Sequence, residues 1–357
     1  MERERMWWIL LGFPGWGPVK IRQLVERTGC LKRATHLVVK SHSNGAEIAK
    51  SRNELFDRTL ALEQAWSCSI ENKHYPIAWR EYADSPLIFF GMGAFVQAQR
   101  SRHVGIVGTR SCSDHAVRLA FELGVELGRR KWTVVSGLAK GVDEAAHRGA
   151  CYSGCRTIGV LGGPLRPLSP RSSRYLAGQM IRMGGSIITE HAIGEEVHPW
   201  HFASRNRLVV GLSEALIMVQ SPKKGGALIS AQLAIEMGID CWVYRPSTRE
   251  QSRRWEGNMN LLESFPEMGW STSNELIERL INRSSAANPC LSELAMPESF
   301  RRIWKEMNAL GKGHSSDISR SVNRPLELVE SQLHQMELQG WVRRTPGGWY
   351  VPVYFGW

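Results

Sequence analysis

Short apolar runs alternate with longer amphipathic stretches between residues 103 and 244. The apolar runs are HVGIV, WTVV, RTIGVL, SIIT, ALIMV and CWVY, and the stretches between them, such as DHAVRLAFELGVELG, have apolar residues at helical spacing. This alternation predicts β-strands connected by α-helices, and therefore a mostly parallel sheet with helices on both faces. The strands of such a sheet are apolar almost throughout because both faces are covered. We therefore predict a Rossmann-like, doubly wound α/β domain.

The two flanking regions have different patterns. Residues 7–65 contain Pro and Gly at positions 12–18 and then an amphipathic run, which predicts helices. Residues 298–340 contain three helical patterns, and the sequence WVRRTPGGWYV then alternates around a Pro-Gly-Gly turn, as a β-hairpin does. Three helices and a hairpin predict a winged helix-turn-helix at the C-terminal end.

These changes of pattern also predict domain boundaries. We expect a helical domain at residues 1–78, the Rossmann-like domain at 79–268, a linker at 269–296 and a winged-helix domain at 297–357. The linker prediction rests on the Ser, Ala, Asn and Pro residues that follow a short helical pattern.

The composition narrows the class of protein. Of the 357 residues, 43% are hydrophobic and 22% are charged, as in a globular protein. No apolar run approaches the roughly 20 residues that a membrane helix needs, and the N-terminus has no cleavage site typical of a signal peptide. The seven Cys are scattered without a CxxC pair, which indicates reduced thiols. We therefore expect a cytoplasmic protein without a membrane segment.

Positive charge is concentrated in the predicted Rossmann-like domain. The formal net charge of the chain is +11, of which residues 1–101 contribute +4, residues 102–265 contribute +7 and residues 266–357 contribute zero. A basic excess favours a polyanionic partner such as nucleic acid, although charge also serves solubility alone. The middle of the chain is therefore where we expect a binding site.

The first predicted strand ends in the turn Gly108-Thr109-Arg110, before a predicted helix. A glycine turn at a helix N-terminus leaves backbone N–H groups free at the positive end of the helix dipole, which suits an anion. Arg110 adds a guanidinium fork for phosphate, although a tight turn with a surface arginine is the alternative. Gly105 and Gly108 lack the GxGxxG spacing, so the sequence gives NAD binding little support.

A second turn, SGLAKGVD (residues 136–143), follows the next strand. Its glycines and Ser136 again present hydrogen-bond donors, with Lys140 beside them. We expect Asp143 to cap the following helix. His147 lies one helical turn further along, and we expect it in the core or at an interface rather than in a site.

After the fourth strand, which ends at Glu190, the sequence HPWHFASRNR (residues 198–207) combines two guanidinium groups, an amide and two aromatic rings. Arginine clamps phosphate, while Phe or Trp stacks on an unpaired base for about 1–3 kcal/mol. His198 and His201 could hold a metal only with a third ligand that the sequence does not indicate, so we expect no metal site.

The fifth strand leads into SPKKGGALISAQ (residues 221–232), where two Lys precede two Gly at a helix start. This is another candidate phosphate cradle, but it is not a Walker loop because no Gly-Lys-Ser/Thr follows the glycines. All these turns lie at the carboxyl ends of parallel strands, which is the edge where open α/β sheets bind ligands. We therefore predict a surface for a string of phosphates rather than a pocket for one cofactor.

Taken together, these motifs resemble the DprA/Smf (DNA-processing protein A) family. The resemblance rests on GTR (108–110), SGLAKGVDEAAH (136–147), GG (162–163), TE (189–190), HFASRNRLVVGLS (201–213) and GGALISAQLA (225–234). The N-terminal GFPGWGPVKIRQLVERTG is similar to that family's helix-hairpin-helix or SAM-like domain, and residues 298–357 are similar to its winged helix.

The resemblance implies a homodimeric protein that binds single-stranded DNA in preference to duplex. It also implies delivery of DNA to the RecA recombinase in natural transformation, together with or against single-strand-binding protein, and neither catalysis nor a cofactor. The DNA-binding residues that it implies are Gly108, Thr109, Arg110, Ser136, Gly137, Lys140, Phe202, Arg205, Asn206, Arg207, Lys224, Gly225 and Gly226. Replacing Arg110 or Arg205 with Glu is then expected to abolish DNA binding without unfolding the domain.

Three places depart from the family pattern. Ala227 stands where the family has a serine, and we expect it to weaken one phosphate contact. Residues 168–170 (LSP) replace a Tyr-Pro among several arginines, and Arg245-Pro246 replaces a Pro-Gly before the basic sequence STREQSRRWEG. These differences affect the detailed geometry of the edge but leave the phosphate turns intact.

Two other functions remain open. The chain could be a nucleotide-binding or nucleotide-hydrolysing enzyme, because Gly225-Gly226 and Glu236 loosely resemble the PGGxGTxxE motif of phosphoribohydrolases with a similar fold. Lys224 stands where that motif has Pro, however, and Glu236 is too far along the chain. The chain could also be a nucleotide-sensing regulator whose winged helix binds duplex DNA, but the zero net charge of residues 266–357 argues against this.

Overall fold

The chain folds into two compact units, Met1–Ile277 and Glu278–Trp357. The structure, a computed structural model, describes residues 1–80, 82, 84–94, 102–168, 170–286, 298–310, 313–338, 342–345 and 349–352.

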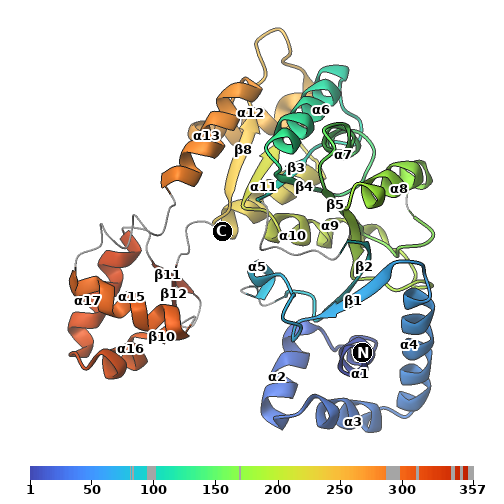
Figure 1. Cartoon of the computed structure of the whole chain (residues 1–357), viewed down its shortest axis with the longest axis vertical. Helices are drawn as coiled ribbons and strands as arrows, with labels where there is room; N and C mark the ends of the chain where they lie inside the picture. Colours follow the sequence, from blue (N-terminus) through green and yellow to red (C-terminus); the bar gives the residue numbers. More distant parts are fainter. Residues whose placement is uncertain are drawn as a thin grey trace. The chain divides into compact units, whose positions relative to one another are not determined.

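A nine-stranded sheet forms the centre of the first unit (Figure 1), in the order β1-β2-β6-β5-β4-β3-β7-β8-β9. Neighbouring strands from β6 to β9 in this order are parallel, whereas β2 is antiparallel to β6 and to β1. The strands are β1 (Ala65–Ser69), β2 (Ile88–Gly93), β3 (His103–Val107), β4 (Thr133–Ser136), β5 (Thr157–Val160), β6 (Ser186–Thr189), β7 (Ala215–Met218), β8 (Asp240–Tyr244) and β9 (Gly269–Trp270).

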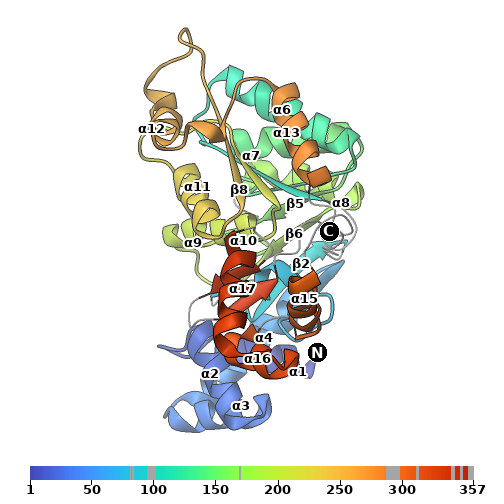
Figure 2. The same cartoon turned by 90° about the vertical axis from the view of Figure 1, so that its left-hand side faces the viewer.

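Helices cover both faces of this sheet. Figure 2 shows α6, α7 and α8 on one side of the strands and α11 and α12 on the other. The helices of this part are α5 (Ile77–Arg80), α6 (Asp114–Arg129), α7 (Val142–Tyr152), α8 (Arg174–Arg182), α9 (Pro199–Ser204), α10 (Asn206–Gly211), α11 (Gly226–Glu236) and α12 (Glu256–Ser264), with 3-10 turns η1 (Arg171–Ser173), η2 (Arg253–Trp255) and η3 (Pro266–Met268). The next helix, α13 (Ser273–Ala286), begins in the first unit and ends in the second. None of the helices in the described part of the chain has the length and hydrophobicity needed to span a bilayer.

Four N-terminal helices pack at the β1 and β2 edge of the sheet (Figure 1). They are α1 (Glu2–Leu10), α2 (Pro18–Thr28), α3 (Leu31–Ser41) and α4 (Gly45–Leu60). Trp8, Leu10 and Phe56 from these helices share one buried cluster with Phe90 of β2, and the rings of Trp8 and Phe90 meet edge to face at 5.0 Å. The bundle is therefore anchored to the sheet by apolar burial.

The predicted α/β class is confirmed, because all six strands expected between residues 103 and 244 are present and parallel. The sequence pattern did not reveal β1, β2 or β9. Within the predicted linker, residues 269–286 contain β9 and α13, and residues 287–297 lie outside the described part of the chain. The domain boundaries remain predictions, with β1 belonging to the large sheet rather than to the helical bundle.

The second unit is built from helices and a small antiparallel sheet. Its elements are α15 (Glu298–Leu310), β10 (Gly313–His314), α16 (Ser315–Val322), α17 (Leu326–Leu338), β11 (Val342–Thr345) and β12 (Trp349–Pro352), with strand order β10-β12-β11. Ile303, Ile318 and Leu333 bring one apolar side chain from each helix into its core. The predicted order of three helices and a hairpin is consistent with this arrangement, and the winged-helix assignment remains a prediction.

Candidate nucleic-acid interface

The turns that follow β3 and β7 lie side by side at the carboxyl edge of the sheet. The chain runs from β3 toward β4 on one side, and β7 and β8 lie on the other side of β3, so the direction of winding reverses between β3 and β7. The backbone N–H of Thr109 donates to the carbonyl of Gln220 at 2.8 Å, and that of Ser113 donates to Gln220 Oε1 at 2.8 Å. Such a switch point is where open α/β sheets bind their ligands.

The turn after β3 presents a cation beside an aromatic ring. A Cβ on Gly108 would lie 2.5 Å from the side chain of Val142, so glycine allows the turn to pack against the start of α7. The exposed guanidinium of Arg110 lies 5.3 Å from the centre of the Phe202 ring. Arg110 has no acidic partner in the described part of the chain, so its charge can meet an external anion.

The turn after β4 uses most of its polar groups within the fold. Ser136 is buried, and its hydroxyl donates to the carbonyl of Ile106 at 2.5 Å. The N–H of Gly137 donates to Asp143 Oδ2 at 3.1 Å. Ser136 and Gly137 were expected to meet phosphate, but these contacts engage both of them inside the protein. Lys140 in the same turn is exposed.

The sequence predicted that Asp143 caps α7, but the structure places it elsewhere. The capping position is Gly141, whereas Asp143 lies in the first turn of the helix and accepts its hydrogen bond from the preceding loop. Burial raises the pKa of the Asp143 carboxyl. His147 is buried in the core as expected, with Nδ1 2.7 Å from Thr157 Oγ1, and burial lowers the pKa of His147 to about 3.

Arg205 lies beneath the turns rather than on their surface. Its side chain is buried, and Nη1 donates to the carbonyl of Val160 at 2.6 Å, at the end of β5. A Cβ on Gly137 would overlap this guanidinium, so glycine is needed for the close approach of the turn. Burial lowers the pKa of Arg205, while the charge of Asp143 opposes that shift. The burial of Arg205 argues against the expectation that Arg205→Glu leaves the fold intact, because the substitution would place a second carboxylate near Asp143.

The other predicted residues of the 198–207 segment are engaged to different degrees. Arg207 forms a bidentate pair with Glu190 at 2.7 and 2.8 Å and also contacts Asp84 at 3.1 Å. Asn206 Nδ2 donates to the carbonyl of Gly226 at 3.2 Å, and Phe202 is half-buried. Arg207 is thus committed to carboxylates of its own chain, and Phe202 keeps part of its ring accessible.

The turn after β7 is the most open of the four. Lys223 and Lys224 are exposed, and neither has an acidic partner among the described residues. Gly225 is the capping residue of α11, and a Cβ on Gly226 would meet no atom within 4 Å. Gly226 therefore leaves room for a ligand beside the first turn of α11, next to two lysines, as an anion site requires. Ala227 is buried in the apolar cluster beneath α11, and the weaker phosphate contact expected there stays a prediction.

Two amides that the sequence analysis did not single out hold the β7 turn in place. Gln220 is fully buried and, besides its contacts across the β3 turn, its amide contacts Ser113 Oγ at 3.2 Å. Asn258 accepts from the N–H of Ser221 at 2.8 Å and donates to the carbonyls of Val219 and Tyr244 at 2.9 Å. Gln220 stands directly after an apolar run, whereas nothing in the sequence around Asn258 sets it apart. Both act by positioning the turn.

The exposed cations of this edge come from several connections. Ser173 Oγ donates to the carbonyl of Leu138 at 3.1 Å, so the connection between β5 and α8 lies against the turn after β4. Exposed cations along the edge include Arg110, Lys140, Arg166, Arg171, Arg174, Lys223, Lys224, Arg253 and Arg254. No group of three His, Cys, Asp or Glu side chains in the described part of the chain is placed to hold a metal ion.

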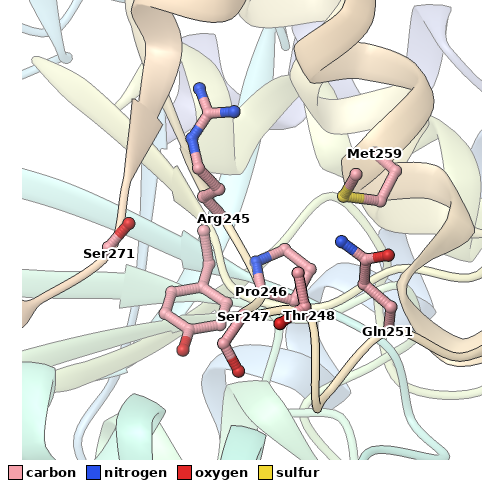
Figure 3. Close-up of a pocket in the computed structure, with 8 residues that line it drawn as sticks. Arg245, Pro246, Ser247, Thr248, Gln251, Met259 and Ser271 are labelled. Carbon is pink, nitrogen blue, oxygen red and sulfur yellow. The ribbon is translucent and has the colours of Figure 1, made fainter.

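A shallow hollow of about 380 Å³ lies at the ends of β8 and β9 (Figure 3). Its lining is more apolar than polar; Ser247, Gln251 and Ser271 contribute hydroxyl and amide groups, and the thioether of Met259 lies on one side. Arg245 donates through Nη2 to the carbonyl of Pro266 at 3.0 Å. Among the described residues, no carboxylate lines the hollow, but the hydroxyl of Tyr244, which does, donates to Glu250 Oε2 at 3.3 Å.

Comparison with known proteins agrees with the motifs. Residues 66–280 match the family described as DNA recombination-mediator protein A. The DNA processing protein DprA of Bacillus subtilis is 32% identical over 215 residues, which cover 60% of this chain and 71% of that protein. Protein Smf of Escherichia coli is 26% identical over 296 residues, covering 78% of this chain and 75% of that protein.

Solved structures give the same result. The structure of DNA processing protein A from Streptococcus pneumoniae superposes with a TM-score of 0.57 at 25% identity, covering 69% of this chain and 86% of that one. DNA processing protein A from Helicobacter pylori, whose structure was reported for its single-stranded DNA binding mode, superposes with a TM-score of 0.53 at 26% identity. That comparison covers 60% of this chain and 96% of the Helicobacter chain.

Proposed function

Since the chain belongs to the DNA recombination-mediator protein A family, we propose that it binds single-stranded DNA along the carboxyl edge of its sheet. The observation that carries the proposal is the row of exposed cations without acidic partners in the described part of the chain, centred on Arg110 and Lys224 at the switch point. Single-stranded nucleic acid is bound by such cationic edges combined with aromatic rings. Arg110 beside Phe202 supplies both in one place.

The site divides into an outer and an inner layer. In the outer layer, Arg110, Lys140 and Lys224 would neutralise phosphates, and the N–H groups at the start of α11 would donate to one of them. In the inner layer, Arg205 joins the ends of β4 and β5 and positions the turns from below. Of the residues expected to meet DNA, Arg207 supports the site through Glu190 instead.

The cellular role that we propose is that of a recombination mediator. The chain would protect incoming single strands and load RecA onto them during transformation, working with or against single-strand-binding protein, as a homodimer in the cytoplasm. Membership of the family supports these finer roles as proposals.

We propose a binding role without catalysis. The alternative of a nucleotide hydrolase needs a carboxylate beside the glycines at residues 225–226. Glu236 lies at the other end of α11, about 15 Å along the helix axis, and its carboxylate accepts from Gln232 at 3.0 Å. The buried Asp143 is hydrogen-bonded to Gly137. These two carboxylates are thus occupied by the fold.

Arg110→Glu tests the proposal directly. We expect the affinity for an oligothymidine, measured by fluorescence anisotropy, to fall at least about tenfold, because a charge-assisted phosphate contact is replaced by repulsion. Arg129→Glu is the matched control, since Arg129 is exposed at the far end of α6 and its partner Glu126 keeps Arg130. Unchanged affinity in Arg110→Glu with an intact fold would refute the site.

A further inference from the structure

The side chain of Trp200 is mostly exposed to solvent, which is unusual for such a large aromatic residue. Its side chain is 63% exposed and lies in the first turn of α9, directly after Pro199. An indole buries more apolar surface than almost any other side chain when it is packed, and that stabilisation is absent here. The position of Trp200 is therefore not explained by the stability of the fold.

Two imidazole rings hold the indole in place. The ring of His198 is nearly parallel to it, with 9° between the planes and 6.0 Å between the centres, and the ring of His201 meets it edge-on at 3.8 Å. The backbone N–H of His198 donates to His201 Nδ1 at 3.2 Å, which caps α9. Trp200 is thus ordered by its neighbours although most of its surface is open.

A chain of contacts connects this ring cluster to the N-terminal helices. The ring of His191 lies 4.1 Å from that of His201, and His191 Nδ1 is 3.3 Å from Glu195 Oε2. Glu195 pairs with Arg52 of α4, whose guanidinium lies 3.3 Å from the ring centre of Trp8. Although burial opposes it, His191 and Arg52 hold the pKa of the Glu195 carboxyl below its usual range. The N-terminal helices are therefore connected to Trp200 through the ionised carboxylate of Glu195 and the two imidazole rings next to it.

The ring cluster lies on the same edge of the sheet as the candidate interface. His191 follows the end of β6 by two residues, and β6 is the neighbour of β5. The end of β5 in turn carries Gly162, where a Cβ would lie 2.8 Å from the ring of Phe202. Because neighbouring strands are about 4.8 Å apart, Trp200 is close to the Arg110–Phe202 pair along the edge.

We propose that Trp200 is a stacking platform for one unpaired base of the DNA, at the point where the strand passes the end of β6. The proposal rests on the proposed function and adds the residue that reads the unpaired state of the DNA. A flat aromatic ring stacks on any unpaired base, whereas the bases of a duplex are stacked on each other and are not available to it. Trp200 would therefore contribute to the preference for single strands, while Arg110 and the lysines bind phosphates of either form.

The test separates stacking from charge. The affinity of Trp200→Ala is measured for an oligothymidine of about twenty nucleotides, which exceeds a typical site, for an abasic oligomer of the same length, and for a duplex. We expect binding of the oligothymidine to weaken about fivefold to a hundredfold, with no change for the abasic oligomer or the duplex and no change in salt dependence. Trp200→Phe should recover most of the affinity.

Tyr152→Ala is the matched control. Tyr152 is 74% exposed and ends α7, which starts at the carboxyl edge and runs back to the opposite edge of the sheet. Wild-type affinity of Trp200→Ala for oligothymidine overturns the proposal and would leave Trp200 free for a protein partner. Equal weakening for the abasic oligomer also overturns it, because Trp200 would then only shape the cationic edge. If Arg110→Glu has no effect on any of the three ligands, the proposed function itself has failed.

Discussion

The cations of the candidate interface fall into two groups according to what they contact. Arg110, Lys140 and Lys224 are exposed and lack acidic partners in the described part of the chain. Arg205 and Arg207 are held by groups of the protein, a strand-end carbonyl in one case and two carboxylates in the other. Neutralising a residue of the first group should therefore weaken the proposed DNA binding and leave the fold intact. Neutralising a residue of the second group should destabilise the fold.

Arg205→Met should destabilise the first unit. The substitution keeps an unbranched apolar stem but removes the guanidinium, which leaves the carbonyl of Val160 without this donor and the buried Asp143 without a nearby cation. We expect the free energy of unfolding, measured by urea denaturation, to fall by about 3–5 kcal/mol. Lys140→Met, at an exposed position of the same edge, should change it by less than about 0.5 kcal/mol. Wild-type stability of Arg205→Met combined with lost DNA binding would mean that Arg205 contacts DNA directly.

The sequence could predict which residue types gather at this edge but not how deep each one lies. Arg205 and Arg207 are two positions apart in one basic segment, and nothing in the segment separates a buried guanidinium from a paired one. Depth depends on the crossing of α9 and α10 over the ends of β4 and β5, which brings Gly137 and Val160 to Arg205. Those partners lie 68 and 45 positions away along the chain, so local pattern cannot show them.

At the scale of elements, the turns after β3 and β4 pack closely against each other. Gly141 has a φ of +87°, and a Cβ there would lie 2.6 Å from the carbonyl oxygen of Thr109. The two turns can approach this closely only because that Cβ is absent. The cations Arg110 and Lys140 are consequently held close to each other.

Gly141→Ala should separate these turns and weaken both the fold and the interface. We expect a loss of about 1–3 kcal/mol in the free energy of unfolding, together with a lower affinity for single-stranded DNA. Gly226→Ala is the contrasting change, since a Cβ at that position meets no atom within 4 Å, and its stability should stay within about 0.5 kcal/mol of wild type. Urea denaturation of both variants checks this, and equal losses in the two would contradict the packing described for Gly141.

The parallel core of the sheet was predictable because each strand is buried on both faces and bounded by helical patterns. β1 and β2 were not, because they are antiparallel additions to the edge and follow the helical bundle without a change in composition. β9 has only two residues, Gly269 and Trp270, which is too short for any periodicity. The DprA/Smf family assignment from the motifs is confirmed by the match over residues 66–280.

At the scale of the whole molecule, charge is distributed as a DNA-binding role requires. Residues 102–265, which contain the candidate interface, have a net charge of +7, whereas the net charge of residues 266–357 is zero. Binding to the sheet edge should therefore release counterions from the DNA, and its strength should depend on salt. The second unit should contribute little to that dependence.

The most direct test of the central claim is the affinity of the full chain for a single strand and for a duplex of equal length, measured between about 50 and 200 mM salt. Each phosphate contacted in a single strand lowers the slope of log affinity against log salt by about 0.7. Arg110, Lys140 and Lys224 together therefore predict a slope of about −2, with the single strand bound more tightly at every salt concentration. A slope near zero, or a duplex bound as tightly as the single strand, would contradict the account.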